Sequence, residues 1–342
     1  MKVVCICDAG APEMLMQNAK KLPGCDVELF IDPAMLDIRH LTMVERTAEK
    51  GGSEAFEASQ ELIAAVTGAD AIVTHVTPVN KAMLDAAPDL KYLGVMRTGY
   101  EHINMDVCNE RGVTVFNAEG RNAVAVADQT VALMLCEMRN IARGHAALMN
   151  GKWIKTFPNV MYSHDMKNCT VGIIGVGKIG TLVAQRLKGF GCRILGCDLF
   201  LPEEEILRRG CDEAVSKEEL LRRSDFVTMH MIYNEGDPHL IGAEELAMMK
   251  KTAILVNCAR SGLVDTDALI AALQENLIGG AAIDVFDQEP LPEDHPFLSL
   301  PNVTLTPHSA GTSIDAFMNS AVIILGQFEQ ILRGETPRNK VN

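Results

Sequence analysis

Short apolar runs recur along the first 117 residues, and polar stretches with helical or turn-forming character separate them. Runs of this kind, rich in Val and Ile, are typical of buried strands. Their alternation with helices predicts a parallel sheet that is covered by helices on both faces. The runs are KVVCICD (2–8), VELF (27–30), ADAIVTH (69–75), LKYLGVM (90–96) and VTVFN (113–117).

Two segments show the wider spacing of helices. Residues 37–67 are polar and rich in Glu, with apolar positions at helical intervals, which predicts a surface helix broken at Gly51-Gly52. Residues 121–149 contain no Pro, have no Gly before Gly144, and are apolar on nearly all sides. We expect one long helix there, buried inside the molecule or in a subunit interface.

A second series of apolar runs follows that helix. It predicts a second parallel sheet, so the fold class is α/β with two doubly wound domains. A last helix, near residues 313–332, is expected to return to the first domain. The runs are VGIIGVG (171–177), RILGCD (193–198), FVTMHM (226–231), AILVNCA (253–259), GGAAIDVF (279–286) and NVTLTPH (302–308).

The first run of the second series ends in a glycine motif, Gly175-x-Gly177-x-x-Gly180, and Asp198 ends the next run. The first glycine allows a tight turn, the second lets backbone approach a pyrophosphate, and the third lets helix and strand pack closely. A carboxylate at the position of Asp198 accepts from the ribose 2′-hydroxyl and repels a 2′-phosphate. The motif predicts a dinucleotide site that prefers NAD to NADP.

The amino-acid composition and net charge argue against several other classes of binding partner. The 342 residues are 48% hydrophobic and 22% charged, which is enough for two globular cores, and the formal net charge is −14. Nucleic acid or an anionic membrane as a partner calls for a basic surface, so we expect neither. Ten cysteines without C-x-x-C spacing predict a reducing, cytoplasmic compartment and no metal site. No run approaches 18 apolar residues.

Three polar residues follow strands of the second predicted sheet: Arg260, Glu289 and His308. Ligands of open α/β sheets bind outside the carboxyl ends of the strands, so these side chains are expected to converge there. Hydride transfer to a carbonyl carbon needs a proton donor and an anchor for the substrate. His308 suits the donor, Glu289 would stabilise its imidazolium, and the fork of Arg260 would hold a 2-oxo acid. Singly, each residue has a plainer interpretation, as a solvated side chain or a surface ion pair.

Four ordered motifs resemble the D-isomer-specific 2-hydroxyacid dehydrogenase family, which includes phosphoglycerate, glycerate, D-lactate and hydroxypyruvate-reducing members. They are GVGKIG (175–180), NCARSGLVD (257–265), DVFDQEP (284–290) and TPHSAG (306–311), and the likeness begins at LKYLGVMRTGYEHIN (90–104). The resemblance implies a flavodoxin-like substrate domain, residues 1–117 and 312–342, with a Rossmann NAD-binding domain, residues 118–311, inserted in it. It also implies a cleft between the domains and a homodimer.

The resemblance assigns roles by position. Arg260, Glu289 and His308 take the catalytic positions, and Asp284 takes the position that binds the nicotinamide carboxamide. The predicted substrate-binding groups are the side chains of His75 and Arg97 and the backbone of the loop at Thr98 and Gly99. The cofactor is lined, mostly through backbone, by Lys178, Ile179, Met231, Cys258 and Ala259.

Some positions depart from the family pattern and leave the substrate open. Glu101, His102 and Asn104 replace the usual Asp, Asn and Asp of the substrate loop, and Asp128 replaces a Glu. Phosphoglycerate members carry an Arg where this chain has Thr74-His75, and we expect no regulatory domain after residue 342. An unphosphorylated 2-hydroxy acid therefore ranks slightly above 3-phosphoglycerate.

Two further classes share the scaffold. NAD-sensing corepressors are binding proteins, and no basic tail or extended disordered segment supports that alternative here. Formate dehydrogenases place Gln where Glu289 stands, and Glu289 favours alcohol–ketone chemistry.

Overall fold

The computed structural model describes residues 1–160, 162–234 and 236–342. The chain divides into two compact units, the first made of Met1–Asn122 with Ser313–Asn342 and the second of Ala123–Thr312. Each contains one sheet in which every strand pair is parallel. The α/β class predicted from the alternating runs is thus what the chain forms.

The sheet of the first unit has the order β2-β1-β3-β4-β5. This is the flavodoxin-like order, with a topological switch point between β1 and β3. Its strands are β1 (Lys2–Cys7), β2 (Asp26–Ile31), β3 (Ala71–Thr74), β4 (Tyr92–Val95) and β5 (Thr114–Asn117). Its α-helices are α1 (Glu13–Met16), α2 (Ile38–Gly51), α3 (Gln60–Val66), α4 (Lys81–Ala86), α5 (Met105–Arg111) and α13 (Ile314–Leu332), with 3₁₀ turns at Gln17–Lys21, Pro33–Leu36 and Ser53–Ala55.

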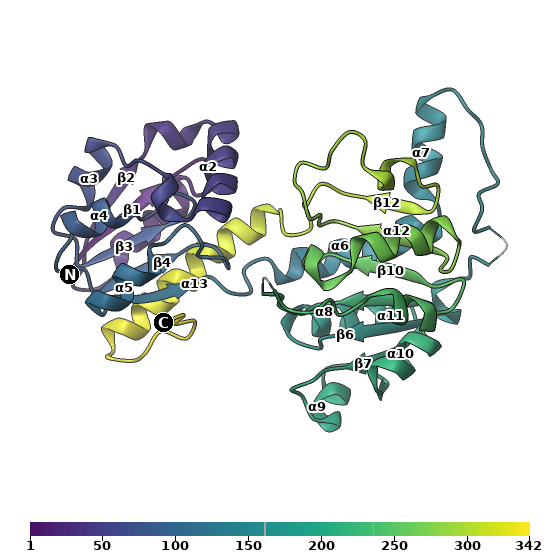
Figure 1. The fold of residues 1–342 in the computed structure, drawn as a ribbon. Coiled ribbons are helices and arrows are strands. Elements are labelled where there is room, and N and C mark those ends of the chain that lie inside the picture. Colours follow the sequence, from purple (N-terminus) through teal and green to yellow (C-terminus); the bar gives the residue numbers. More distant parts are fainter. Residues whose placement is uncertain (161, 235) are drawn as a thin grey trace. The chain divides into compact units, whose positions relative to one another are not determined.

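Helix α13 joins this unit from the far end of the sequence, drawn in yellow beside the purple and blue sheet elements (Figure 1). Its inner face packs on the sheet, and Phe328 meets Phe116 of β5 edge to face with ring centroids 5.3 Å apart. Gln327 donates to the carbonyl oxygen of Asn117, at 2.9 Å. These contacts complete a core that the first 122 residues do not close alone.

The sheet of the second unit has the order β12-β11-β10-β9-β6-β7-β8. The order reverses between β6 and β9, which is the switch point where Rossmann folds bind dinucleotides. Its strands are β6 (Thr170–Ile174), β7 (Arg193–Cys197), β8 (Glu213–Ala214), β9 (Phe226–Met229), β10 (Ile254–Asn257), β11 (Gly280–Ile283) and β12 (Val303–Leu305). The two-residue edge strand β8 gave no apolar run and was missed in the sequence.

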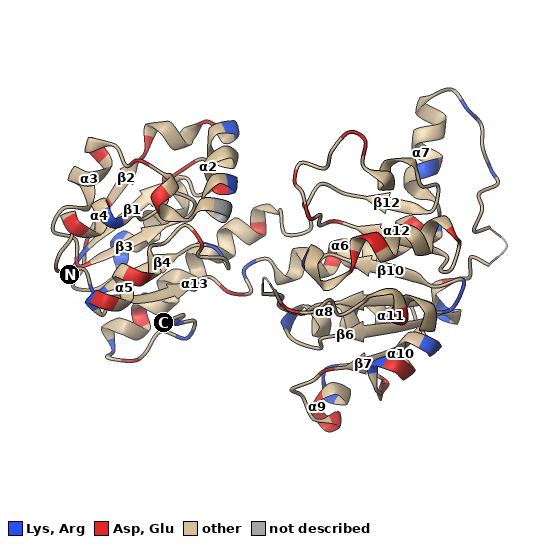
Figure 2. Cartoon of the chain, in the orientation of Figure 1, with Lys and Arg blue, Asp and Glu red and all other residues tan. Residues whose placement is uncertain are grey.

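The helices of the second unit lie along both faces of its sheet (Figure 1). They are α6 (Ala123–Met138), α7 (Ile141–Met149), α8 (Lys178–Lys188), α9 (Glu203–Arg208), α10 (Lys217–Arg223), α11 (Ala243–Met248) and α12 (Thr266–Gln274), with 3₁₀ turns at Met166–Asn168, Ser261–Leu263 and Pro296–Ser299. Outer helices such as α9 and α10 carry acidic residues in the first turn and basic residues in the last (Figure 2), and Arg208 pairs with Glu205 and Arg223 with Glu219.

The single helix expected over residues 121–149 is wrong, because α6 ends at Met138 and α7 begins at Ile141. Asn140 breaks the helix with φ at +56°, a left-handed conformation that Asn tolerates better than most residues. Its amide donates to Asn159 Oδ1 at 2.6 Å, which holds the break in place.

The two halves of that segment differ in burial. Helix α6 packs on α8 and on β10, β11 and β12 of its own unit, so its apolar faces are largely covered without a second subunit. None of the nine residues of α7, all of which the structure describes, is buried. No helix in the described ranges combines the length and apolar character needed to cross a bilayer.

Candidate active site

The glycine loop connects β6 to α8 in the way that the motif predicts. Gly175 has φ at +88°, and a Cβ there would lie 2.7 Å from the carbonyl oxygen of His230. A Cβ on Gly180 would collide with the carbonyl oxygen of Gly175, so helix and loop need both glycines. A Cβ on Gly177, by contrast, would meet no heavy atom within 4 Å. The loop is thus tight against its own chain and open above Gly177, which fits a pyrophosphate at the start of α8.

Asp198 follows β7 and is bonded to this loop. Its Oδ2 accepts from the backbone N–H of Val176 at 2.8 Å, and its Oδ1 accepts from Phe200 and Leu201 at 2.9 and 3.2 Å. These bonds fix the direction of the carboxylate and leave acceptor capacity for a ribose hydroxyl. The neighbours Leu199 and Phe200 are exposed and offer no cation for a 2′-phosphate.

His308 and Glu289 are brought together from two loops of the second unit. His308 Nδ1 lies 2.8 Å from Glu289 Oε2, while the other oxygen of Glu289 accepts from the backbone N–H of Phe286 at 3.0 Å. The side chain of His308 is 49% exposed and that of Glu289 is 29% exposed. The carboxylate fixes the imidazole through Nδ1, so Nε2 is the nitrogen available to a ligand.

The backbone of His308 is held in an uncommon conformation, with φ at +51°. Asp284, which is buried beneath the turn, accounts for it. Its Oδ1 accepts from the backbone N–H of Ser309 at 3.0 Å and from the hydroxyl of Thr306, and its Oδ2 accepts from the N–H of Ala310 at 2.8 Å. Asp284 therefore acts as a positioning residue for His308, a contact between β11 and the loop after β12 that no local motif reveals.

Arg260 follows β10, between the glycine loop and the His308 turn in the strand order. Asn257 fixes its backbone, because the Asn257 amide donates to the Arg260 carbonyl oxygen at 2.9 Å and accepts from the N–H of Ala259 at 3.0 Å. Its exposed guanidinium donates to the carbonyl oxygen of Ala259 at 2.8 Å. Among the described residues no hydrogen bond or ion pair joins it to Glu289 or His308, so Arg260 stands apart from that pair.

The remaining predicted cofactor residues lie around the same strand ends. Lys178 and Ile179 begin α8, and Met231 follows β9. Cys258 and Ala259 follow β10, and burial raises the pKa of the Cys258 thiol to about 12, so this thiol is unreactive.

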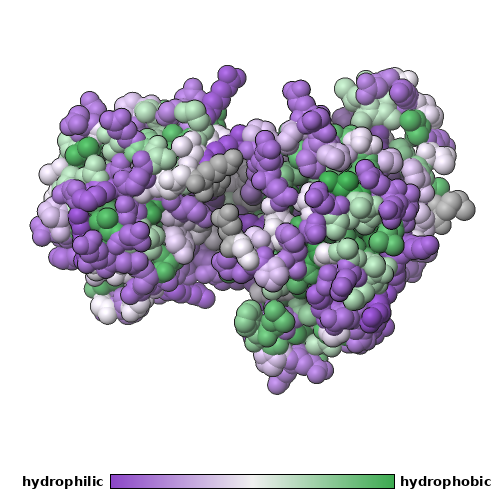
Figure 3. Space-filling model, viewed as in Figure 1, coloured by the Kyte–Doolittle hydropathy of each residue, from purple (hydrophilic) through white to green (hydrophobic). Residues whose placement is uncertain are grey.

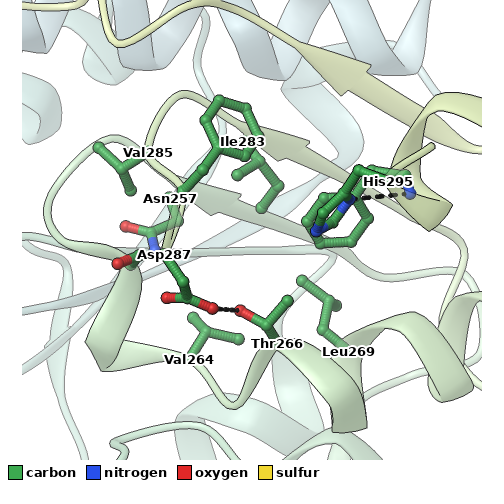
Figure 4. A pocket seen from close by; sticks show the side chains of 11 residues that line it. Asn257, Val264, Thr266, Leu269, Ile283, Val285, Asp287 and His295 are labelled. Atoms are coloured by element: carbon green, nitrogen blue, oxygen red, sulfur yellow. Dashed lines mark hydrogen bonds between the residues drawn. The ribbon is translucent and has the colours of Figure 1, made fainter. Parts of the chain in front are cut away.

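A small pocket lies between the start of α12 and the loop after β11, and Thr266 and Asp287 are among the residues that line it (Figure 4). Its wall joins α12 to the loop after β11, where the Thr266 hydroxyl donates to Asp287 Oδ2 at 2.6 Å. Apolar side chains, including Val264, Leu269 and Ile283, fill most of the lining.

In the first unit, His75 follows β3 and is paired with Asp8, which follows β1. His75 Nδ1 lies 3.0 Å from Asp8 Oδ1, and both side chains are buried. Burial alone would raise the pKa of Asp8, but the hydrogen bonds from His75 and from the N–H groups of Ala11 and Val76 outweigh it, so the pKa is lowered. His75 was predicted from the sequence as a substrate-binding residue, whereas Asp8 was not predicted.

The substrate loop after β4 contains the other predicted residues of this unit. Arg97 Nη1 lies 2.5 Å from Glu45 Oε1, and the carbonyl oxygen of Thr98 accepts from the Asn117 amide at 2.6 Å. Gly99 lies beneath the carboxylate of Glu101, which a Cβ at this position would meet. Burial, followed by the positive charge of Arg97, lowers the pKa of His102 to about 3, so its imidazole is neutral.

Comparison with known proteins decides the family. The family model for the NAD-binding domain of D-isomer specific 2-hydroxyacid dehydrogenases matches residues 131–310. The chain belongs to this family. Its members are NAD-dependent oxidoreductases, and the family, the fold class and the cofactor predicted from the sequence are confirmed.

Curated relatives carry two different names. The glyoxylate reductase of Korarchaeum cryptofilum is 39% identical over 291 residues, which are 84% of this chain and 87% of that protein. The D-3-phosphoglycerate dehydrogenase of Methanocaldococcus jannaschii is 38% identical over 285 residues, 83% of this chain. The match covers 53% of that protein, so the chain spans about half its length. The structure of D-lactate dehydrogenase with NAD⁺ from Lactobacillus jensenii superposes with a TM-score of 0.77 at 25% identity, covering 100% of both chains.

Proposed function

We propose that the chain is a D-2-hydroxyacid dehydrogenase that interconverts a small 2-hydroxy acid and its 2-oxo acid, with His308 as the proton donor and acceptor. The observation that carries the proposal is the pairing of His308 Nδ1 with Glu289 Oε2 at 2.8 Å. When bound, NAD would accept or supply the hydride. His308 Nε2 would give its proton to the alkoxide oxygen that forms during reduction and recover it during oxidation.

The other residues would bind and orient. The guanidinium of Arg260 offers a fork that can hold the carbonyl and carboxylate oxygens of a 2-oxo acid together. The backbone at Thr98 and Gly99 would bind the substrate carboxylate through N–H groups. Gly175, Gly177 and Gly180 would cradle the pyrophosphate, and Asp198 would bind the ribose.

A panel of 2-oxo acids tests this function. Glyoxylate, hydroxypyruvate, pyruvate, phenylpyruvate and phosphohydroxypyruvate are offered with NADH, and the absorbance of NADH is followed. We expect steady oxidation of NADH with at least one of them. Binding of NADH without turnover on any member would instead support an NAD-sensing binding protein.

We also propose a homodimer, which the hydrophobic surface of α7 and the segment after it supports. Met149 is 74% exposed and Trp153 is 82% exposed, and Ile141, Leu148 and Ile154 are exposed beside them in the sequence. Hydrophobic side chains reach the surface in the region of α7 (Figure 3). Exposed apolar patches of this kind mark interaction sites. A cytoplasmic location is proposed because all ten cysteines are free.

A further inference from the structure

Arg209, the residue that follows α9, connects this helix to the glycine loop after β6. Its Nη1 atom donates to the carbonyl oxygen of Val176 at 2.8 Å, and its Nε atom donates to Glu205 Oε1 at 2.6 Å. Val176 lies between Gly175 and Gly177, so the guanidinium binds the middle of the glycine motif. No local pattern predicts this contact, because Arg209 and Val176 are 33 positions apart.

Helix α9 is anchored close to the glycine loop. Ile206, within the helix, is buried in the core that α8 shares with the sheet. Gly210 follows the helix with φ at +109°, and a Cβ at this position would lie 3.6 Å from the Cβ of Ala184 on α8. The end of α9 therefore packs against α8, and Arg209, between Ile206 and Gly210, is held within reach of the loop from which α8 begins.

Glu205 fixes the direction of the Arg209 guanidinium. The same carboxylate accepts from Nε and Nη2 of Arg208, at 2.8 Å each. The hydrogen bonds from Arg208 and then from Arg209 lower the pKa of Glu205 to about 2, so its carboxylate is charged at neutral pH. The side chain of Arg208 is 74% exposed and that of Arg209 is 29% exposed. In the described part of the chain, Arg209 is hydrogen-bonded to the loop and Arg208 is not.

The backbone of Val176 is held on both of its polar sides. Its N–H donates to Asp198 Oδ2 at 2.8 Å, and its carbonyl oxygen accepts from Arg209 and, at 3.3 Å, from the Thr181 hydroxyl. A trans peptide directs its C=O and N–H in opposite directions, so the carbonyl bound by Arg209 turns the N–H of Gly177 away from Arg209. Among the described residues no backbone acceptor is bonded to this N–H. The loop therefore keeps an unused donor at the start of α8.

We propose that Arg209 is a positioning residue of the NAD site: it binds the Val176 carbonyl and thereby fixes the N–H groups at the start of α8 on which the pyrophosphate is held. The proposal rests on the pyrophosphate site proposed above and is independent of the role of His308. A loop that is already ordered binds a ligand more tightly, because binding does not have to order it. The guanidinium also adds a positive charge near the positive end of the α8 dipole, which favours an anion.

Equilibrium binding of NADH to the full-length protein, followed by fluorescence titration, tests the proposal. Arg209→Met keeps an unbranched side chain and removes the donors, and Arg208→Met is the matched control, because Arg208 shares Glu205 but not the loop. We expect Arg209→Met to weaken NADH binding by about fivefold or more, as loss of a charged donor implies. Arg208→Met should change the affinity by less than about twofold, since exposed ion pairs contribute little.

Two further variants make the result independent of the folding of Arg209→Met. Arg209→Lys retains a charged donor and should recover part of the affinity, although it lacks the fork that binds Val176 and Glu205 together. Arg209→Gln retains only an uncharged donor and should bind NADH about threefold or more weakly than the wild type. Folded variants of both kinds with wild-type affinity would overturn the proposal.

Fragments of the cofactor locate the effect. ADP-ribose contains the pyrophosphate, whereas adenosine contains the base and ribose without phosphate, and both can compete with NADH in the titration. We expect Arg209→Met to lose affinity for ADP-ribose as it does for NADH and to bind adenosine within about twofold of the wild type, because only the pyrophosphate contacts depend on the loop. Equal losses on ADP-ribose and adenosine would contradict the proposal. A lower thermal midpoint Tm with unchanged NADH affinity would make Arg209 a structural residue.

Kinetics separates this proposal from the proposed activity. At saturating NADH and 2-oxo acid, kcat of Arg209→Met should stay within about threefold of the wild type, while KM for NADH rises. Turnover by a wild type whose affinity for NADH equals that of Arg209→Met would contradict the role of Arg209 alone. Weaker NADH binding in Arg209→Met, without turnover of any 2-oxo acid by the wild type, would contradict the activity alone. A wild type that binds neither NADH nor ADP-ribose would contradict both.

Discussion

Glu289 Oε2 lies 2.8 Å from His308 Nδ1, which leaves Nε2 as the ring nitrogen that can exchange a proton with a ligand. The pair is held from both sides, because Phe286 donates to Glu289 and Asp284 binds the turn that contains His308. The geometry resembles that of other acid–base pairs, in which a carboxylate selects the tautomer and orientation of an imidazole. Glu289 acts through His308 in this account and is a positioning residue.

Glu289→Gln is therefore expected to lower kcat for 2-oxo acid reduction by about tenfold to a hundredfold while KM changes less than threefold, because the imidazolium loses its counter-charge and substrate contacts stay. Glu289→Asp retains the charge and should recover part of the loss if the shorter side chain reaches Nδ1. Parallel losses in kcat and in the affinity for substrate would assign Glu289 to substrate binding instead.

Cofactor preference should change in Asp198→Asn. The variant retains an acceptor for the N–H groups of Phe200 and Leu201 and removes the charge that repels a 2′-phosphate. We expect the preference for NADH over NADPH to fall by about tenfold or more, since like-charge juxtaposition costs several kcal/mol. Fluorescence titration of both cofactors checks this, with Asp212→Asn as a control for loss of one charge in the same unit. A wild type that binds NADPH more tightly would contradict the assignment of Asp198.

The ion pair between the buried Glu137 and the partly exposed Arg143 should dominate the stability of the second unit around α6 and α7. Arg143 donates to both oxygens of Glu137 at 2.7 and 2.8 Å, and the Thr304 hydroxyl donates to Oε2 at 2.6 Å. Burial raises the pKa of Glu137, although Arg143 and Thr304 oppose it. Arg143→Met leaves a buried carboxylate unpaired and should cost about 3 to 5 kcal/mol of unfolding free energy at pH 7.

The double variant Arg143→Met with Glu137→Gln is the matched control, because it removes both charges and keeps an amide near Thr304. We expect it to be clearly more stable than Arg143→Met alone in urea denaturation. A double variant that is less stable than the single one would show that the ion pair contributes little and that packing sets the loss.

Some features of the candidate site can be predicted from the sequence, whereas others are visible only in the three-dimensional structure. The glycine loop, Asp198 and the strand-end positions of Arg260, Glu289 and His308 are readable because periodicity and short spacing encode them. Contacts between distant segments are not encoded locally: Asp284 beneath the His308 turn, Asp8 behind His75, and Phe317 beside Arg121 come from separate strands and helices. The break at Asn140 was missed because a single Asn within an apolar pattern is a weak signal.

We predict that the homodimer forms through the exposed hydrophobic side chains of α7 and the segment after it, which include Met149 and Trp153. Met149→Glu with Trp153→Glu adds charge at exposed positions, so it should leave each chain folded and, if these residues form the interface, yield a monomer in sedimentation. Leu133→Asp is the contrasting variant, since Leu133 is buried in its own unit and a charge there should unfold the protein instead. A wild type that is monomeric at tens of micromolar, where an interface of ordinary size is occupied, would contradict the homodimer.

The central claim is that His308 donates the proton during reduction, and single-turnover kinetics of His308→Gln tests it most directly. The enzyme is mixed with NADH and saturating 2-oxo acid, and NADH oxidation is followed in one turnover, with NADH affinity measured separately. We predict a rate that is lower than the wild-type rate by about a hundredfold or more, the share of a positioned general acid, with NADH affinity within about threefold of the wild type. A variant whose rate stays within about threefold of the wild type would show that another group supplies the proton.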